Sequence, residues 1–214
     1  MTDELAPRLD RKISVPDGRQ AIYNFNSDVG TVLNNSGTIN QNSVVVSIMP
    51  SGDRRQKRQS MRFNLSHYNL FVVEDEDFSF YEGSFLLDRR QVLCRCIDDK
   101  VRAAHPLSDP AVLDKVKTYP CVFAGVNERY GRPGDTQLAA MGAITDVSVA
   151  KDGIRVSYMT IKDIPQKALL EAAPALGIRV AQLMNELDDT HWTIKKADIQ
   201  QAMLDVGVDV FSVL

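Results

Sequence analysis

The chain has 214 residues, of which 44% are hydrophobic and 25% are charged, a balance typical of a packed globular protein. Its formal net charge of -3 argues against a protein whose whole surface binds nucleic acid, so any nucleic-acid contact would be local. The acidic first residues do not resemble a secretory signal, and no segment approaches the roughly 20 apolar residues of a membrane-spanning helix. We therefore expect a cytoplasmic protein without membrane association.

The cysteines and histidines do not follow the spacing of a metal site. Cys94 and Cys96 alternate with Arg95 in a strand-like run, and Cys121 stands alone. A structural zinc site needs two pairs of ligands at short spacing. We expect reduced cysteines, no bound metal and no cofactor.

The first part of the chain divides into a flexible arm, residues 1–20, and a β-rich region, residues 21–103. The β-rich region opens with an asparagine-rich repeat of two copies, one beginning Gly30-Thr31-Val32 and the other Gly37-Thr38-Ile39. Each copy offers a short β run closed by residues that favour turns. Two copies bury little surface alone, so the repeat predicts either a self-association element of a homo-oligomer or a plain hairpin at a sheet edge.

A basic run follows the predicted strand 44–49. It consists of Arg54, Arg55, Lys57, Arg58 and Arg62, with no acidic residue between Asp53 and Glu74. Such a run predicts local contact with phosphates or with an acidic partner, although a solvated loop has the same composition.

Four further segments, 63–65, 70–73, 83–87 and 91–97, are predicted strands of a central sheet. Four consecutive carboxylates at 74–77 interrupt them. A metal site needs carboxylates that converge, whereas neighbouring side chains on a strand point to opposite faces. One interpretation of the acidic run is therefore a solvated turn. A metal site formed by Asp75 and Asp77 with Asp98 or Asp99 is the other.

The C-terminal part, residues 110–214, is predicted to be an α+β domain. Asp109 followed by Pro110 is typical of a helix start. Strands are expected at 121–124, 139–147 and 154–161, possible components of a partial barrel, and helices at 165–173, 178–187 and 196–206. The predicted fold class is α+β, with a β-rich antiparallel core and C-terminal helices.

The loop 125–135 holds two arginines and a tyrosine between three glycines and a proline. Planar donors and a ring on a glycine-rich loop are typical of ligand-binding loops. The residues predicted to contact a ligand or partner are Asn127, Arg129, Tyr130 and Arg132. An ordinary long turn is the alternative interpretation.

Only one histidine lies in a setting that suggests catalysis. Asp189 could orient His191 as a general base beside Trp192, the sole tryptophan, or Trp192 could simply anchor the C-terminal helices on the sheet. The chain has no nucleophile elbow and no phosphate-binding glycine motif.

These features favour a non-enzymatic recognition protein or adaptor, an accessory subunit of a multi-component bacterial or phage system. Its ligand would be nucleic acid, a nucleotide or an acidic protein surface. A structural subunit of a homo-oligomeric assembly and a metal-dependent hydrolase are the alternatives that the sequence leaves open.

Overall fold

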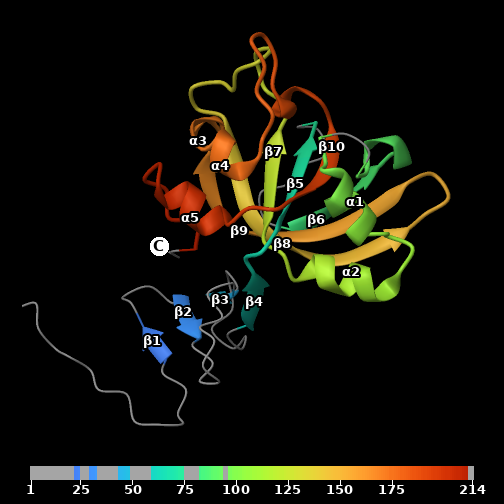
Figure 1. The fold of residues 1–214 in the computed structure, drawn as a ribbon, viewed down its shortest axis with the longest axis vertical. Helices are drawn as coiled ribbons and strands as arrows, with labels where there is room; N and C mark the ends of the chain where they lie inside the picture. Colours follow the sequence, from blue (N-terminus) through green and yellow to red (C-terminus); the bar gives the residue numbers. More distant parts are fainter. Residues whose placement is uncertain are drawn as a thin grey trace, which may run out of the picture.

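The computed structural model of the chain, shown in Figure 1, is a mixed α+β fold with a curled six-stranded sheet and few, short helices. The predicted β-rich α+β class is therefore confirmed. Among the described residues, no helix has the length and apolar character needed to cross a membrane. The structure describes residues 22–24, 29–32, 43–48, 59–74, 82–93 and 96–211.

The N-terminal part forms an antiparallel sheet of four strands in chain order. The strands are β1 (Ile22–Asn24), β2 (Val29–Val32), β3 (Ser43–Ile48) and β4 (Gln59–Asn64). Gly30, Thr31 and Val32, the start of the first repeat copy, lie in β2 and pair with β1 or β3 of the same chain. Gly37, Thr38 and Ile39 lie outside the described residues.

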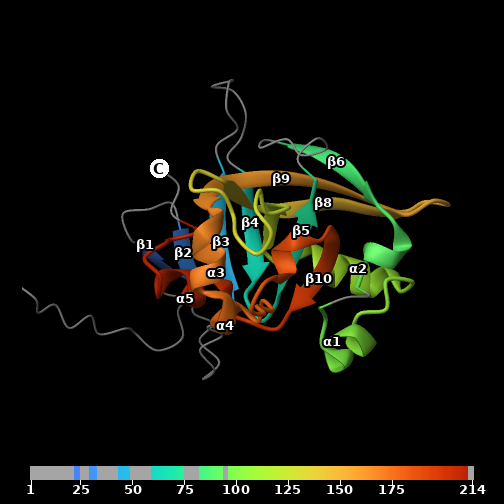
Figure 2. The same ribbon diagram turned by 90° about the horizontal axis from the view of Figure 1, so that it is seen from above.

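The larger sheet has the strand order β10-β5-β7-β8-β9-β6 and curls into a half-barrel (Figure 2). All of its neighbouring strands are antiparallel except β5 and β7. Two register shifts in the long β8–β9 hairpin mark bulges, which bend and twist a strand pair. The strands are β5 (Tyr68–Val73), β6 (Glu82–Leu87), β7 (Cys121–Gly125), β8 (Leu138–Val149), β9 (Ile154–Pro165) and β10 (His191–Lys195).

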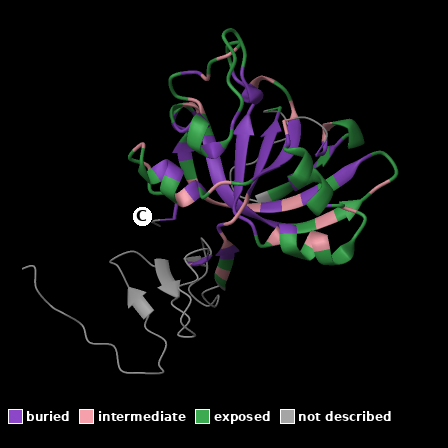
Figure 3. Cartoon of the chain, viewed as in Figure 1, coloured by how far each residue is buried: buried purple, intermediate pink, exposed green. Residues whose placement is uncertain are grey.

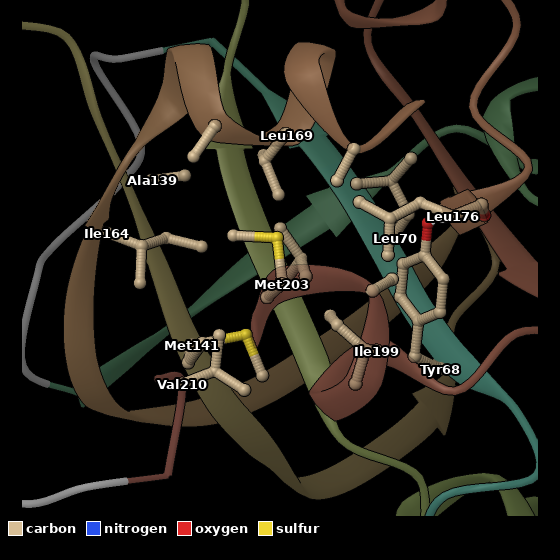
Figure 4. Close-up of a cluster of buried hydrophobic side chains, with 14 of the residues drawn as sticks. Tyr68, Leu70, Ala139, Met141, Ile164, Leu169, Leu176, Ile199, Met203 and Val210 are labelled. Carbon is tan, nitrogen blue, oxygen red and sulfur yellow. Dashed lines mark hydrogen bonds between the residues drawn. The ribbon is translucent and has the colours of Figure 1, made fainter. Parts of the chain in front are cut away.

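Helices pack on each face of this sheet, and three of its strands, β5, β7 and β10, are buried on both faces. On one face, Tyr68 and Leu70 of β5 pack with Met203 and other side chains of the C-terminal helices (Figure 4). On the other face, Phe71 packs in a second core that includes Val116. The first face is covered by α3 (Gln166–Glu171), α4 (Ala173–Leu176) and α5 (Ile199–Leu204), and the second by α1 (Asp99–Ala104) and α2 (Pro110–Lys117).

Trp192 is fully buried in the second core. Its ring stacks on Phe71 at a centroid distance of 5.1 Å, and its Nε1 donates to Asn69 Oδ1 at 3.1 Å. A buried tryptophan N–H needs such an acceptor. The prediction that Trp192 anchors the C-terminal helices on the sheet is wrong. Trp192 belongs to β10, a strand of the sheet, and packs in the second core, whereas the C-terminal helices pack in the first.

The predicted strand 91–97 is wrong. Gln91 ends a 3-10 helix, η2 (Arg89–Gln91), and among the described residues that follow, Leu93 and Cys96 have φ values of 48° and 56°, which an extended strand does not have. The Leu93 N–H donates to the carbonyl oxygen of Trp192, and Arg102 Nε donates to the carbonyl oxygen of Leu93. These tertiary hydrogen bonds replace the ladder of an extended strand.

The predicted helix 178–187 is also wrong. Gly177 ends α4 in the left-handed conformation at φ 67°, and an irregular loop follows that closes with a 3-10 helix, η3 (Glu186–Asp188). The Asn185 side chain accepts from the Leu187 N–H, a local bond that competes with helix formation. The predicted helix 196–206 is confirmed by α5, which Asp198 caps.

Candidate functional site: a paired-loop tip and its buried support

Two loops lie together at one end of the six-stranded sheet. Strand β7 runs parallel to β5, whereas β10 runs antiparallel, so the end of β7 and the start of β10 lie at the same end. The loop 126–137 leaves β7 and the loop 178–190 enters β10, and Figure 1 shows both rising above the sheet at the top. Strand topology therefore joins two segments about fifty residues apart in the sequence.

The first loop contains a tight turn. The backbone N–H of Arg129 donates to the Arg132 carbonyl at 3.1 Å, and the reciprocal bond is 2.8 Å. Gly131, within the turn, has φ 75°, and a Cβ there would lie 2.7 Å from the carbonyl oxygen of Leu183. Glycine is required both by this backbone conformation and by the close approach of the second loop.

Asp188 fastens the two loops to each other. Its Oδ1 accepts from Asn127 Nδ2 at 2.7 Å and from the Gly131 N–H at 2.9 Å. Its Oδ2 accepts from the Asn185 N–H at 2.6 Å, and Asn185 Nδ2 donates to the Gly131 carbonyl at 2.8 Å. Charge-assisted bonds of this kind are stronger than neutral ones, so the carboxylate holds both loops in one arrangement.

Amide side chains, two of them buried, connect this arrangement to the sheet. Gln166 Nε2 donates to the Gly125 carbonyl at 2.9 Å and to Asn127 Oδ1 at 3.0 Å. Gln137 Nε2 donates to the Val126 carbonyl at 2.8 Å. Asn127, a predicted ligand contact, is buried and supports the loop from beneath.

The outer surface of the two loops exposes large apolar and aromatic side chains beside charged ones. Tyr130 is 70% exposed and Leu183 is 77% exposed, and the Tyr130 hydroxyl donates to Met184 Sδ at 3.7 Å. Arg129 and Arg132 are exposed beside them, and Figure 3 shows the loop ends as exposed. We call Arg129, Tyr130, Arg132, Val180, Leu183 and Met184 the paired-loop tip.

The other predicted contact residues do not join this tip. Arg62 lies on β4, in the four-stranded sheet at the opposite end of Figure 1, and its Nη2 donates to Ser43 Oγ at 3.2 Å. Arg54, Arg55, Lys57 and Arg58 lie outside the described residues. The structure thus brings together three of the predicted contacts, at one turn.

A buried ionic cluster supports the base of the second loop. Lys195 Nζ donates to the Cys96 carbonyl at 2.7 Å and to the Gly177 carbonyl at 2.9 Å, and it lies 2.7 Å from Glu186 Oε1. The side chains of Glu186 and Lys195 are 0% and 7% exposed. His191 Nε2 lies 3.3 Å from the same carboxylate oxygen.

The cluster organises the backbone of the second loop. Glu186 Oε2 accepts from the Arg179 N–H, and the Glu186 N–H donates to the Arg179 carbonyl, both at 2.9 Å. His191 Nδ1 faces the backbone carbonyl of Asp189 at 2.7 Å, so this contact does not involve the Asp189 carboxylate that we expected to orient the ring. Sequence reasoning missed Glu186 and Lys195, because they lie nine residues apart in the sequence and only the fold brings their side chains together.

The protonation states in this cluster follow from its geometry. Burial alone would raise the pKa of Glu186, but hydrogen bonding from His191 and the charge and hydrogen bond of Lys195 outweigh it and lower the pKa. Burial, followed by the charge of Glu186, raises the pKa of the Cys96 thiol. Glu186 is therefore ionised near neutral pH, and Cys96 is a protonated, poorly nucleophilic thiol.

The two described aspartates of the predicted metal site have structural partners. Asp98 Oδ1 accepts from the N–H groups of Lys100 and Val101 at the start of α1, and Asp99 Oδ1 lies 3.0 Å from Arg102 Nη1. Asp75 and Asp77 lie outside the described residues. In the part of the chain that the structure describes, no three His, Cys, Asp or Glu side chains are grouped to hold a metal ion.

Comparison with known proteins gives no relative on which to base a function. No protein-family model, curated protein or solved structure matches the chain. The functional conclusion therefore depends on the geometry of the paired-loop tip and of its buried support.

Proposed function

We propose that the protein is a non-enzymatic recognition protein or adaptor, a cytoplasmic accessory subunit of a bacterial or phage system, that binds an acidic protein surface through the paired-loop tip. The observation that carries the proposal is the exposure of Tyr130 and Leu183 on a backbone fixed by Asp188 and Asn185. Adjacent exposed apolar side chains on a pre-organised support are typical of a binding surface.

The chemistry of the tip favours an acidic protein partner. Tyrosine, methionine and arginine are enriched at protein interfaces, and all three meet here. Arg129 and Arg132 offer planar forks that match carboxylates. Single-stranded nucleic acid is favoured less, because successive bases need several aromatic platforms and the tip has only Tyr130.

The buried cluster beneath the tip supports a non-enzymatic role. The donors of Lys195 are directed at carbonyl and carboxylate oxygens, so its ammonium group is not available as a base or nucleophile. The raised pKa of Cys96 makes a thiolate nucleophile unfavourable. Both observations fit a cluster that holds the second loop in place.

Affinity capture with matched variants tests the proposal. Tagged full-length protein would be compared with the double variants Tyr130→Ser/Leu183→Ser and Arg129→Glu/Arg132→Glu, using a lysate of the source organism and quantitative mass spectrometry. The controls are Val149→Ser and Lys151→Glu, exposed residues of the β8–β9 hairpin.

We expect a partner that wild type and both controls retain, that both tip variants lose, and that added salt releases. Retention of every captured protein by the tip variants would overturn the proposal. Light-scattering mass on a sizing column, recorded at 260 and 280 nm, separates the alternatives. A defined oligomer that the tip variants dissociate would identify the partner as a second copy, and co-purifying nucleic acid released by salt would identify it as nucleic acid.

A further inference from the structure

A cavity lies at the edge of the six-stranded sheet, and none of its lining residues belongs to the paired-loop tip. It has a volume of about 600 Å³ and lies between α1, the residues that follow α4 and the end of β10. Pockets of roughly 300–1,000 Å³ are the usual size for small-molecule ligands. The cavity is therefore large enough for an organic ligand and is not merely a site for a single ion.

The charged groups around this cavity are mostly cationic. Lys100, Arg179 and Lys196 line it and are exposed, and among the described residues none of the three has an ion-pair partner. The lining carboxylate is Asp98, which already accepts two backbone N–H groups. The charge of Lys195, which also lines the cavity, is balanced by Glu186. The lining therefore contains three exposed cations from three separate segments and one carboxylate that already accepts two N–H groups.

His67 also lines the cavity. Burial, followed by the nearby charges of His105, Lys115 and Lys196, lowers its pKa to about 4. Its Nδ1 lies 2.9 Å from Ser66 Oγ, and its ring stacks on Tyr119 at 5.2 Å. Within the described part of the chain, the hydrogen bond of this ring is made by Nδ1, and Nε2 makes none.

The floor of the cavity is apolar. Val101 and Ala104 contribute from α1, and Ile194 contributes from β10. An apolar surface beside a few convergent polar groups is the usual composition of a ligand pocket. Arginine binds phosphate through paired donors, and lysine binds it as a point charge.

We propose that this cavity binds a phosphorylated small molecule of about mononucleotide size, with its phosphate held by Lys100, Arg179 and Lys196. The non-phosphate part of the ligand lies on Val101, Ala104 and Ile194. The proposal does not depend on the paired-loop tip, because none of these six residues belongs to the tip.

Calorimetric titration of the full-length protein tests it with three probes: AMP, inorganic pyrophosphate and adenosine. AMP should bind more tightly than pyrophosphate, since it also covers the apolar floor, and adenosine should bind at least about tenfold more weakly than AMP. The variants Lys100→Gln, Arg179→Gln and Lys196→Gln should each weaken AMP binding about tenfold. Lys151→Gln, the same charge change in the β8–β9 turn, should leave the affinity for AMP unchanged.

A second measurement locates the ligand. AMP should shift the ring resonances of His67 in wild-type protein, and this shift should be lost in Arg179→Gln at the same AMP concentration. Four results would overturn the proposal: no AMP binding at low millimolar concentration, equal binding of AMP and adenosine, pyrophosphate binding as tight as that of AMP, or equal effects of Lys151→Gln and the three cavity variants.

Discussion

Replacing Lys195 by methionine removes the lysine that forms an ion pair with Glu186 and, within the described residues, leaves His191 as the side chain closest to this carboxylate. The carboxylate is 0% exposed, so the variant keeps a buried charge with reduced compensation. Removing one partner of a buried ion pair lowers the unfolding free energy by about 3–5 kcal/mol. The carbonyl oxygens of Cys96 and Gly177 also lose a charged donor. We therefore expect Lys195→Met to lower the unfolding free energy by about 3–5 kcal/mol.

Urea denaturation at several pH values measures this loss. In the wild type, the lowered pKa of Glu186 contributes stability that is present above the ordinary carboxyl pKa and is lost as the pH falls through the folded-state pKa. In Lys195→Met the folded-state pKa rises, because burial is then opposed by fewer groups. The stability difference between the two proteins should therefore be full at pH 7 and should shrink in acid.

Two further variants test whether the loss comes from the buried charge of Glu186. Lys196→Met, which changes the exposed neighbouring lysine, should alter stability by no more than about 0.5 kcal/mol. The double variant Glu186→Gln/Lys195→Met should be more stable than Lys195→Met, because it no longer buries a carboxylate. A pH-independent loss, or equal losses for Lys195→Met and Lys196→Met, would refute the electrostatic explanation.

Two other predictions follow from the loops and the thiols. Gly131→Ala should lower the unfolding free energy by more than Gly177→Ala in denaturation experiments. Both glycines have a positive φ, and placing an alanine in that conformation costs about 1–2 kcal/mol. Only the Cβ at position 131 would also meet backbone, the Leu183 carbonyl oxygen at 2.7 Å. Equal losses would show that the close approach to the second loop costs nothing. Iodoacetamide at pH 7 should leave Cys121 unmodified in the folded protein, since burial raises its pKa to about 12, and should modify Cys96 more slowly than a free cysteine, since burial also raises that pKa. Peptide mass spectrometry measures both, and rapid modification of either thiol would contradict the described burial.

Regular local patterns in the sequence predicted several elements correctly. Ile154, Val156 and Tyr158 alternate with polar residues, and β9 buries these three side chains on one face. Asp109 with Pro110 predicted the start of α2, where the Asp109 side chain caps the helix. These signals succeed because neighbouring residues alone determine them.

Elements that depend on distant residues were predicted poorly. Residues 191–195 show no alternation, because β10 is buried on both faces, and its identity as a strand depends on pairing with β5. Residues 178–187 have helix-compatible apolar positions, yet Asp188 and Asn185 bind the other loop instead. The turn with Arg129 and Arg132 was visible in the sequence, but its pairing with Leu183 arises only from the sheet topology.

The position of β10 beside β5 also constrains the order in which the chain folds during synthesis. Trp192 and its hydrogen-bond acceptor Asn69 are separated by 123 residues, so the ribosome must release almost the whole described chain before this contact forms. Until then, the N–H and C=O groups on one edge of β5 have no strand to pair with, and an open edge of this kind invites pairing with other chains. Nascent chains that stop before His191 should therefore be prone to aggregation and dependent on chaperones.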